Sequence, residues 1–517
     1  MNAAGVLHHH ADRFPERVAV GFDGEVVTYA GLVERAAVTA GALRGLGVGR
    51  GDVVAHLLYN SLDFIDLMVA CAQLGAVFMP LNWRLAGLEL EYIVNHAGAR
   101  VLVSEPELEP LVAPVRADLV CERFVRVGAA GAGSPATGAD AWEPLDGLRA
   151  AATPVRQIAR VDRDDLLRLM YTSGTTARPK GVMITHGNLD AKNTAHAVEL
   201  GFGDSDVGIV GGPLYHVGAL DLTTTTLLHV GATTHILRKF DAATVLDAIE
   251  RLRGTTVWLA PAMVNLVLAD PSLASRDLSS MRVIIDGGEK MPLPLIERVL
   301  DVFPNAWFAD AYGLTETVSG DTFLDKGLSR HKLGSVGKPV IHLELRVVDE
   351  RDEDVPANEP GEIVLRGPKV CKGYWKDEEA TARAFRGGWF HTGDVGILDD
   401  EGFLTIADRI KDMVISGGEN IATPEVERVL YEHPAVLEAA VVGSPDPRWG
   451  EVPAAYVALR PGSEVTAEEL VAFCAARLAR FKAPKIVRFV DTLPRNPSGK
   501  VLKRELRDEE HHHMERT

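Results

Sequence analysis

The stretch YTSGTTARPKG, residues 171–181, lies between apolar runs at residues 166–170 and 182–184. Its glycines and hydroxyl side chains offer backbone N–H groups and small donors to phosphate oxygens, and Lys180 adds a positive charge. A plain polar hairpin loop would explain Gly174 and Pro179, but not so many hydroxyl groups beside two cations. The spacing from Gly174 to Lys180 and the intervening Pro179 do not fit the Walker frame. The stretch therefore predicts a phosphate-binding loop of another kind.

Helical patterns alternate with short Val/Ile/Leu runs around this loop, which predicts an α/β fold. A chain of 517 residues exceeds one hydrophobic core, so we expect a large N-terminal domain of layered α/β subdomains, residues 1–410, and a small mobile α+β C-terminal domain, residues 411–517. A change to β-rich alternation predicts a β subdomain at about residues 340–366. The clearest predicted elements are helices at residues 32–46, 242–252, 424–431 and 467–480, and strands at residues 52–58, 255–260, 439–442 and 454–459.

The composition excludes several classes of protein. Lys and Arg total 54 against 72 Asp and Glu, a net charge of −18, which argues against a nucleic-acid partner. The four cysteines lack metal-ligand or disulfide spacing, which indicates a reducing compartment, and we expect a cytoplasmic protein. No secretory signal is visible at the N-terminus, and residues 64–81 are interpreted as a buried helix running into a strand rather than as an integral membrane segment. The sequence leaves open whether the protein forms a homodimer.

Five further motifs follow the loop in order. They are DAYGLTE (310–316), GWFHTGD (388–394), DRIKD (408–412), SGGEN (416–420) and PSGK (497–500). Together they resemble the adenylate-forming superfamily, which includes acyl-CoA synthetases, luciferases and peptide-synthetase adenylation domains. The resemblance covers nearly the whole chain, and the segment ISGGEN from Ile415 is similar to the fatty- or aryl-acid CoA ligase branch.

The resemblance implies a two-step reaction in which a carboxylic acid and ATP form an acyl-adenylate and pyrophosphate, and coenzyme A then takes the acyl group and releases AMP. ATP, Mg²⁺ and coenzyme A are the implied cofactors and partners, together with the small carboxylic acid. It assigns residues 1–410 to the adenylation domain and residues 411–517 to the mobile AMP-binding C-terminal domain. Because adenylation is mainly charge neutralisation and in-line positioning, it needs the cationic and hydroxyl groups of these motifs.

The same resemblance implies the roles of individual residues. Glu316 and Thr172 would hold the metal, although Thr315 and Glu316 could alone be a helix-capping pair. The implied catalytic residues are Lys500, Thr315, Glu316 and His216. The implied cofactor-binding residues are Thr172, Ser173, Gly174, Thr175, Thr176, Lys180, Gly287, Gly288, Asp310, Ala311, Tyr312, Gly313, Asp394, Arg409, Lys411 and Gly418.

Several of these roles follow the chemistry of the side chain. Asp394, with Arg409, would bind the ribose, and Tyr312 would flank the adenine, unless it is simply a core tyrosine. Lys500 would reach the α-phosphate during adenylation. Lys411 would be the hinge about which the small domain rotates, and Gly418 would line a narrow channel for the pantetheine thiol.

The acid pocket is expected around residues 215–222, 286–288 and 310–320, with His216 beside the substrate carboxylate. Ala177 replaces a glycine that is common in the loop, and Asp286 and Asp310 stand where many relatives carry neutral side chains. If these carboxylates face the pocket, a polar or amino-substituted acid is favoured over a long-chain fatty acid. A carrier protein, an amine or another small nucleophile stays open as the acceptor. A non-catalytic nucleotide-binding protein is disfavoured by the presence of Lys500, Glu316 and Asp394.

Overall fold

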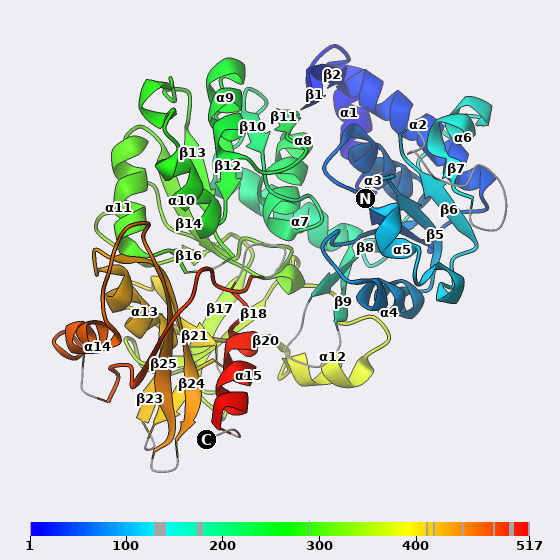
Figure 1. Cartoon of the computed structure of the whole chain (residues 1–517). Coiled ribbons are helices and arrows are strands. Elements are labelled where there is room, and N and C mark those ends of the chain that lie inside the picture. Colours follow the sequence, from blue (N-terminus) through cyan, green and yellow to red (C-terminus); the bar gives the residue numbers. More distant parts are fainter. Residues whose placement is uncertain are drawn as a thin grey trace.

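The computed structural model covers most of the chain (Figure 1). It describes residues 2–128, 141–172, 179–288, 290–409, 412–416, 419–446, 449–478, 481–495 and 501–514, without the side chains at residues 408–409, 419–420, 511 and 513–514.

A seven-stranded sheet organises the N-terminal part, which is blue to cyan in Figure 1. Its order is β7-β6-β5-β3-β4-β8-β9, and only the last pair, β8–β9, is antiparallel. The strands are β3 (Val53–Leu57), β4 (Val77–Pro80), β5 (Ala99–Ser104), β6 (Arg123–Arg126), β7 (Glu143–Pro144), β8 (Leu166–Thr172) and β9 (Lys180–Thr185).

A second, nine-stranded sheet has the order β16-β15-β14-β13-β12-β10-β11-β1-β2. The run from β14 to β1 is parallel, so the carboxyl ends of β12, β13 and β14 lie at one edge. The strands are β1 (Val18–Phe22), β2 (Glu25–Thr28), β10 (Val207–Val210), β11 (Thr233–Ile236), β12 (Thr256–Leu259), β13 (Val283–Asp286), β14 (Trp307–Tyr312), β15 (Thr322–Phe323) and β16 (Lys338–Pro339).

Helices cover these two sheets. They are α1 (Gly5–Arg13), α2 (Tyr29–Gly45), α3 (Leu62–Leu74), α4 (Gly87–Ala97), α5 (Glu109–Val112), α6 (Leu145–Ala151), α7 (His186–Glu199), α8 (Thr226–Val230), α9 (Ala242–Leu252), α10 (Pro261–Ala269) and α11 (Leu293–Val302). Short turns at η1 (Arg116–Asp118), η3 (Leu273–Ser275) and η4 (Thr315–Thr317) are 3₁₀ helices, whereas η2 (Gly218–Thr225) is a π-helix.

Two five-stranded sheets follow. The first contains β17 (Glu344–Val348), β18 (Pro360–Arg366), β19 (Phe385–Arg386), β20 (Trp389–Leu398) and β21 (Leu404–Arg409), with α12 (Glu378–Ala384). The second contains β22 (Val414–Ser416), β23 (Glu419–Ile421), β24 (Val436–Asp446), β25 (Gly450–Leu459) and β26 (Ile486–Phe489), with α13 (Thr423–Tyr431), α14 (Ala467–Ala475) and α15 (Lys503–Met514). In Figure 1 these last helices, orange to red, gather away from α1–α3.

Local sequence explains where the elements begin and end. Asp241 caps α9 by accepting a hydrogen bond from the Thr244 N–H, and the observed helix has the predicted bounds. Ser61 caps α3, which ends at Gly75 in the left-handed conformation that glycine favours. The segment at residues 64–81 is a buried helix and strand, as predicted. The predicted helix at residues 467–480 is too long, because α14 ends at Ala475, where the Arg477 N–H donates to Cys474 O, three residues back, in a tighter turn. Residues 479–480 lie outside the described residues.

The α/β prediction and the β subdomain are confirmed. The predicted boundary between residues 410 and 411 falls outside the described residues and stays a prediction. Within the described ranges, the helices are each too short or too polar to cross a bilayer.

Candidate active site

The β8–β9 hairpin holds the two ends of the predicted phosphate-binding loop. Thr172 lies directly opposite Lys180 in the antiparallel register, and both are partly exposed. The hairpin therefore brings these two predicted site residues together. The other predicted residues of the loop lie outside the described part of the chain: Ser173, Gly174, Thr175 and Thr176.

Glu316 lies close to this hairpin and is held by a tyrosine. The Tyr374 hydroxyl donates to Glu316 Oε1 at 3.0 Å, and the Lys180 ammonium lies 4.9 Å from the centre of the Tyr374 ring. Burial and the negative charge of Glu316 raise the pKa of Tyr374, so the phenol keeps its proton and remains a donor. A carboxylate here offers the hard oxygen ligand that Mg²⁺ prefers, so the predicted metal role of Glu316 fits its chemistry.

A buried Tyr–Asp pair lies at the end of β14. The Tyr312 hydroxyl donates to Asp394 Oδ2 at 2.8 Å, and the two residues are 8% and 5% exposed. Burial and the charge of Asp394 hold the pKa of Tyr312 well above its usual value. Asp394 also lies opposite Arg409 in the β20–β21 register. The pair fixes the orientation of the carboxylate that is predicted to bind the ribose.

The carboxyl ends of β13 and β14 carry two acidic side chains. Asp286 and Asp310 are register partners, and both are buried. Burial raises the pKa of Asp310 to about 7, against the opposing effects of the Lys290 charge and the Ala311 N–H. Two carboxyl groups therefore lie side by side at the strand ends, and Ala311 and Tyr312 follow directly.

Two predicted glycines follow β13. A Cβ on Gly287 would lie 3.0 Å from Ala311 O, whereas Gly288 has a φ of +100° and open space around it. Glycine at 287 thus allows close packing against β14, and Gly288 has a left-handed backbone that favours glycine. A Cβ on Gly313 would lie 2.3 Å from Gly320 N, so the close packing of these two backbone segments requires glycine at this position.

His216 is stacked on Trp258 of β12. The two ring centres are 5.9 Å apart, with an angle of 24° between the planes. A Cβ on Gly212 or Gly218 would lie within 2.6 Å of the indole, so only glycine allows the loop to pack on this ring. Trp258 is 3% exposed, and its Nε1–H has no hydrogen-bond partner among the described residues. The π-helix η2 begins at Gly218, and such helices often occur at functional sites.

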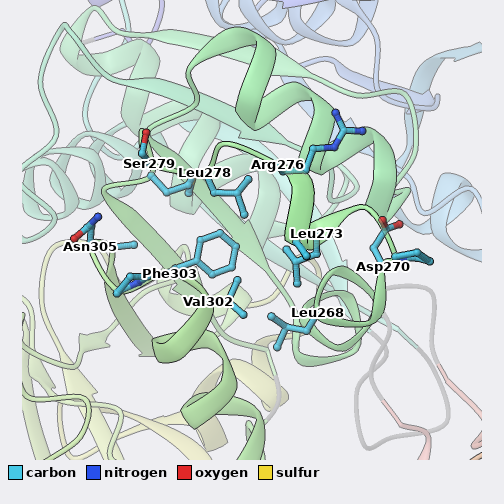
Figure 2. A pocket seen from close by; sticks show the side chains of 14 residues that line it. Leu268, Asp270, Leu273, Arg276, Leu278, Ser279, Val302, Phe303 and Asn305 are labelled. Carbon is cyan, nitrogen blue, oxygen red and sulfur yellow. The ribbon is translucent and has the colours of Figure 1, made fainter.

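A separate cavity of about 630 Å³ lies at the other end of the same strands. Figure 2 shows its wall, formed by the turns that precede β13 and β14 and by side chains such as Leu268, Leu278 and Phe303. Because parallel strands end together, this cavity is on the opposite edge of the sheet from Asp286 and Asp310. It does not belong to the site built by the predicted residues.

Part of the predicted site cannot be placed. The side chain of Arg409 and the whole of Lys411, Gly418 and Lys500 lie outside the described residues, and their roles stay predictions.

Two residues of the site were not predicted from the sequence. Tyr374 follows a short turn after β18, and Trp258 is one aromatic residue in an apolar strand. Neither position has a local pattern that distinguishes it from an ordinary core residue.

A hairpin loop of phosphate-binding composition, a carboxylate beside it and a buried Tyr–Asp pair at the strand ends define a nucleotide-binding α/β enzyme with a small additional domain. Comparison with known proteins agrees with this class. The model of the AMP-binding enzyme family matches residues 7–375, and that of the AMP-binding enzyme C-terminal domain matches residues 425–500. The chain belongs to the AMP-binding enzyme family, in its acyl- and aryl-CoA ligase branch.

Its relatives match nearly the whole chain. It is 42% identical to a feruloyl-CoA synthase from Amycolatopsis sp. over 95% of this chain and 96% of the relative. It is 39% identical to an indoleacetate–CoA ligase from Aromatoleum aromaticum, over 97% and 96% of the two chains. Among solved structures, o-succinylbenzoate coenzyme A synthetase from Bacillus subtilis, in complex with ATP and magnesium ion, has a TM-score of 0.85 at 33% identity and covers 97% of this chain and 98% of that one.

Proposed function

We propose that this chain activates an aromatic or arylalkyl carboxylic acid, with ATP and Mg²⁺ as cofactors and coenzyme A as the acceptor. Its class of activity is that of an ATP-dependent, AMP-forming acid–CoA ligase that works through an acyl-adenylate. The aromatic nature of the acid and the roles of individual residues are the finer parts of this proposal.

The observation that carries the aromatic assignment is the His216–Trp258 stack. His216 is the residue expected beside the substrate carboxylate, and a flat indole packs against it with glycines on the neighbouring loop. The neighbouring Tyr215 ring packs edge-on against Trp83 at 6.1 Å. Because Trp258 and Tyr215 are buried and His216 is partly exposed, the His216 ring is the part of this stack that a flat acid would contact. The feruloyl and indoleacetate relatives also carry aromatic acids in their names.

We also expect a ring that bears a hydroxyl, methoxy or carbonyl oxygen. This expectation follows from the polar acid that the sequence favours if Asp286 and Asp310 face the pocket.

The side chains then divide the work of adenylation. Asp394, oriented by Tyr312, accepts hydrogen bonds from the ribose, while Thr172 and Lys180 bind phosphate oxygens at the hairpin. Glu316 and Thr172 would hold magnesium, which would supply charge neutralisation at the phosphates. Lys500 completes the site from the C-terminal domain. Together these groups would hold the nucleotide so that the acid carboxylate approaches the α-phosphate in line, which is most of what this reaction requires.

The test is a panel of acids assayed for magnesium-dependent pyrophosphate release, with and without coenzyme A, and with products identified by mass. The panel compares cinnamic, hydroxycinnamic, methoxycinnamic, indoleacetic, amino-substituted benzoic and long-chain fatty acids. We expect thioester and AMP with the oxygen-substituted aryl acids, at a kcat/KM at least roughly tenfold above that of the fatty acids.

A strict preference for long alkyl acids would refute the aromatic assignment. Adenylate formation without a CoA-dependent product would instead replace coenzyme A by a carrier protein or an amine as the acceptor.

A further inference from the structure

The segment at residues 367–375, here called the clasp, lies between the phosphate-loop hairpin and Glu316. On one side, the Met183 N–H donates to Gly373 O at 3.0 Å, and the Trp375 N–H donates to Gly181 O at 2.8 Å. On the other side, the Cys371 N–H donates to Glu316 O at 2.7 Å. The clasp therefore ties the backbone of β9 to the backbone of Glu316.

Lys369 of the clasp is a buried cation. It is 2% exposed, and its ammonium donates to Ser319 O at 2.7 Å, Gly320 O at 2.6 Å and Asp321 Oδ1 at 2.7 Å. Lysine is almost never buried unless it is paired, and here three acceptors use its three protons. All three acceptors come from the turn that directly follows Glu316.

This turn has an unfavourable backbone. Val318, Ser319 and Gly320 have φ angles of 57°, 69° and 55°, so three successive residues are left-handed. A β-branched residue such as Val318 rarely adopts this conformation and needs surrounding contacts to hold it. The left-handed run turns two carbonyl oxygens toward Lys369, and an ammonium is the group that can bind both.

Other buried contacts hold the same turn. The Thr317 hydroxyl donates to Asp321 Oδ2 at 2.6 Å, and His196 Nε2 lies 2.9 Å from Gly320 O. Asp321 is 0% exposed, and its carboxylate is compensated by the side chains of Lys369 and Thr317 and by the backbone of Leu314. Several buried polar contacts therefore hold this turn in one conformation. The turn directly follows Thr315 and Glu316 in the chain.

We propose that Lys369 is a positioning residue for the metal-holding carboxylate. Through Ser319, Gly320 and Asp321 it fixes the turn that presents Glu316, while Tyr374 of the same clasp holds the carboxylate itself. Because the clasp also pairs with β9, it links the β8–β9 hairpin to Glu316. This inference rests on the proposed function, since it takes Glu316 as the metal ligand.

The test uses the full-length protein, four variants and one control variant. D321N removes the negative charge at nearly constant volume, and K369Q replaces the ammonium by a shorter neutral amide. The double variant K369Q/D321N removes both charges, and Y374F removes only the hydroxyl on Glu316. K332Q is the control, because Lys332 is also an ion-paired lysine but lies outside the clasp and pairs with Asp399 and Glu401. Circular dichroism and thermal unfolding establish which variants are folded.

Two readouts follow. Electron paramagnetic resonance measures Mn²⁺ affinity in the presence of ATP, which needs no turnover. Separate half-reactions measure adenylation from acid and MgATP, and thiolysis from preformed acyl-adenylate and coenzyme A. For the folded variants we expect Mn²⁺ affinity to fall and the KM for MgATP to rise, each by roughly tenfold. Thiolysis needs no metal, so we expect it to stay within about twofold of the wild type, and K332Q to match the wild type throughout.

A merely structural role would give a different pattern. Folded K369Q/D321N or D321N with a lower melting temperature but unchanged Mn²⁺ affinity and unchanged KM for MgATP would overturn the assignment of Lys369. If the wild type binds Mn²⁺ and ATP but adenylates no acid, the proposed function fails, and the Mn²⁺ affinities still decide whether Lys369 positions the site.

Discussion

Replacing Asp310 by asparagine removes one buried titrating group from the site. Asp310 is 5% exposed, and Asp286 of the neighbouring strand is its register partner. Burial raises its pKa from 3.8 to about 7, more than Lys290 and the Ala311 N–H lower it. Asparagine has nearly the same volume and does not titrate, so D310N isolates the protonation of this residue.

The sign of the effect on the free energy of unfolding follows from the pKa of Asp310 in the folded protein and its pKa in the unfolded chain. Between about pH 4 and pH 7 the folded protein keeps the Asp310 proton, whereas the unfolded chain has lost it. The folded state therefore binds more protons, and this contribution to stability is present at low pH and is lost as the pH rises toward 7. A shift of about three pKa units corresponds to at most about 4 kcal/mol.

The assay is urea unfolding of the wild type and D310N in half-unit steps from pH 4.5 to pH 8. We expect the difference in free energy of unfolding to move in favour of D310N by up to about 3 kcal/mol across the window, and to be constant above about pH 7.5. D325N, at an exposed aspartate, controls for a general loss of charge. A difference between D310N and the wild type that does not depend on pH would refute the reasoning.

Three further predictions test other parts of the site and fold. Y312F removes the hydroxyl that orients Asp394, so AMP affinity measured by calorimetry should fall roughly tenfold, while an unchanged affinity would mean that the pair is not part of the nucleotide site. G218A places a methyl group about 2.4 Å from the Trp258 indole, so the KM for the acid should rise at least roughly tenfold with little change in the KM for ATP. G203A, where a Cβ meets nothing within 4 Å, is its control, and equal effects of the two variants would contradict the pocket assignment. E510Q weakens the buried contacts of Glu510 with Arg488, Tyr456 and Ser444 and should destabilise the C-terminal sheet by about 2–3 kcal/mol in thermal unfolding, whereas an unchanged melting temperature would show that the charge is not needed.

Periodicity and local motifs were sufficient to predict the architecture. The helix at residues 242–252 was predictable because its apolar spacing and its aspartate cap agree. The end of α14 was not predictable in this way. It is set by a tighter turn at Cys474 and not by a glycine or proline that the sequence would show.

The site shows the same division. Thr172 and Lys180 lie in one motif, so a single hairpin brings them together. Tyr374, Trp258 and Lys369 act through partners far along the chain, such as Glu316 and Asp321, and no local pattern indicates those contacts. A lysine in a loop is ordinarily solvated, and only the fold shows that Lys369 is buried against a left-handed turn. A sequence motif therefore predicts the chemistry of its own residues, but it does not predict which distant residues orient their side chains.

The central claim is that a carboxylate oxygen of the substrate acid attacks the α-phosphate of ATP. The most direct measurement uses an acid from the active class labelled with ¹⁸O in its carboxylate, followed by one complete turnover with ATP and coenzyme A and mass analysis of the products. The account predicts that one labelled oxygen is transferred to AMP, because thiolysis of the acyl-adenylate leaves the bridging oxygen on phosphorus. Label in inorganic phosphate accompanied by ADP, or AMP free of label, would contradict it.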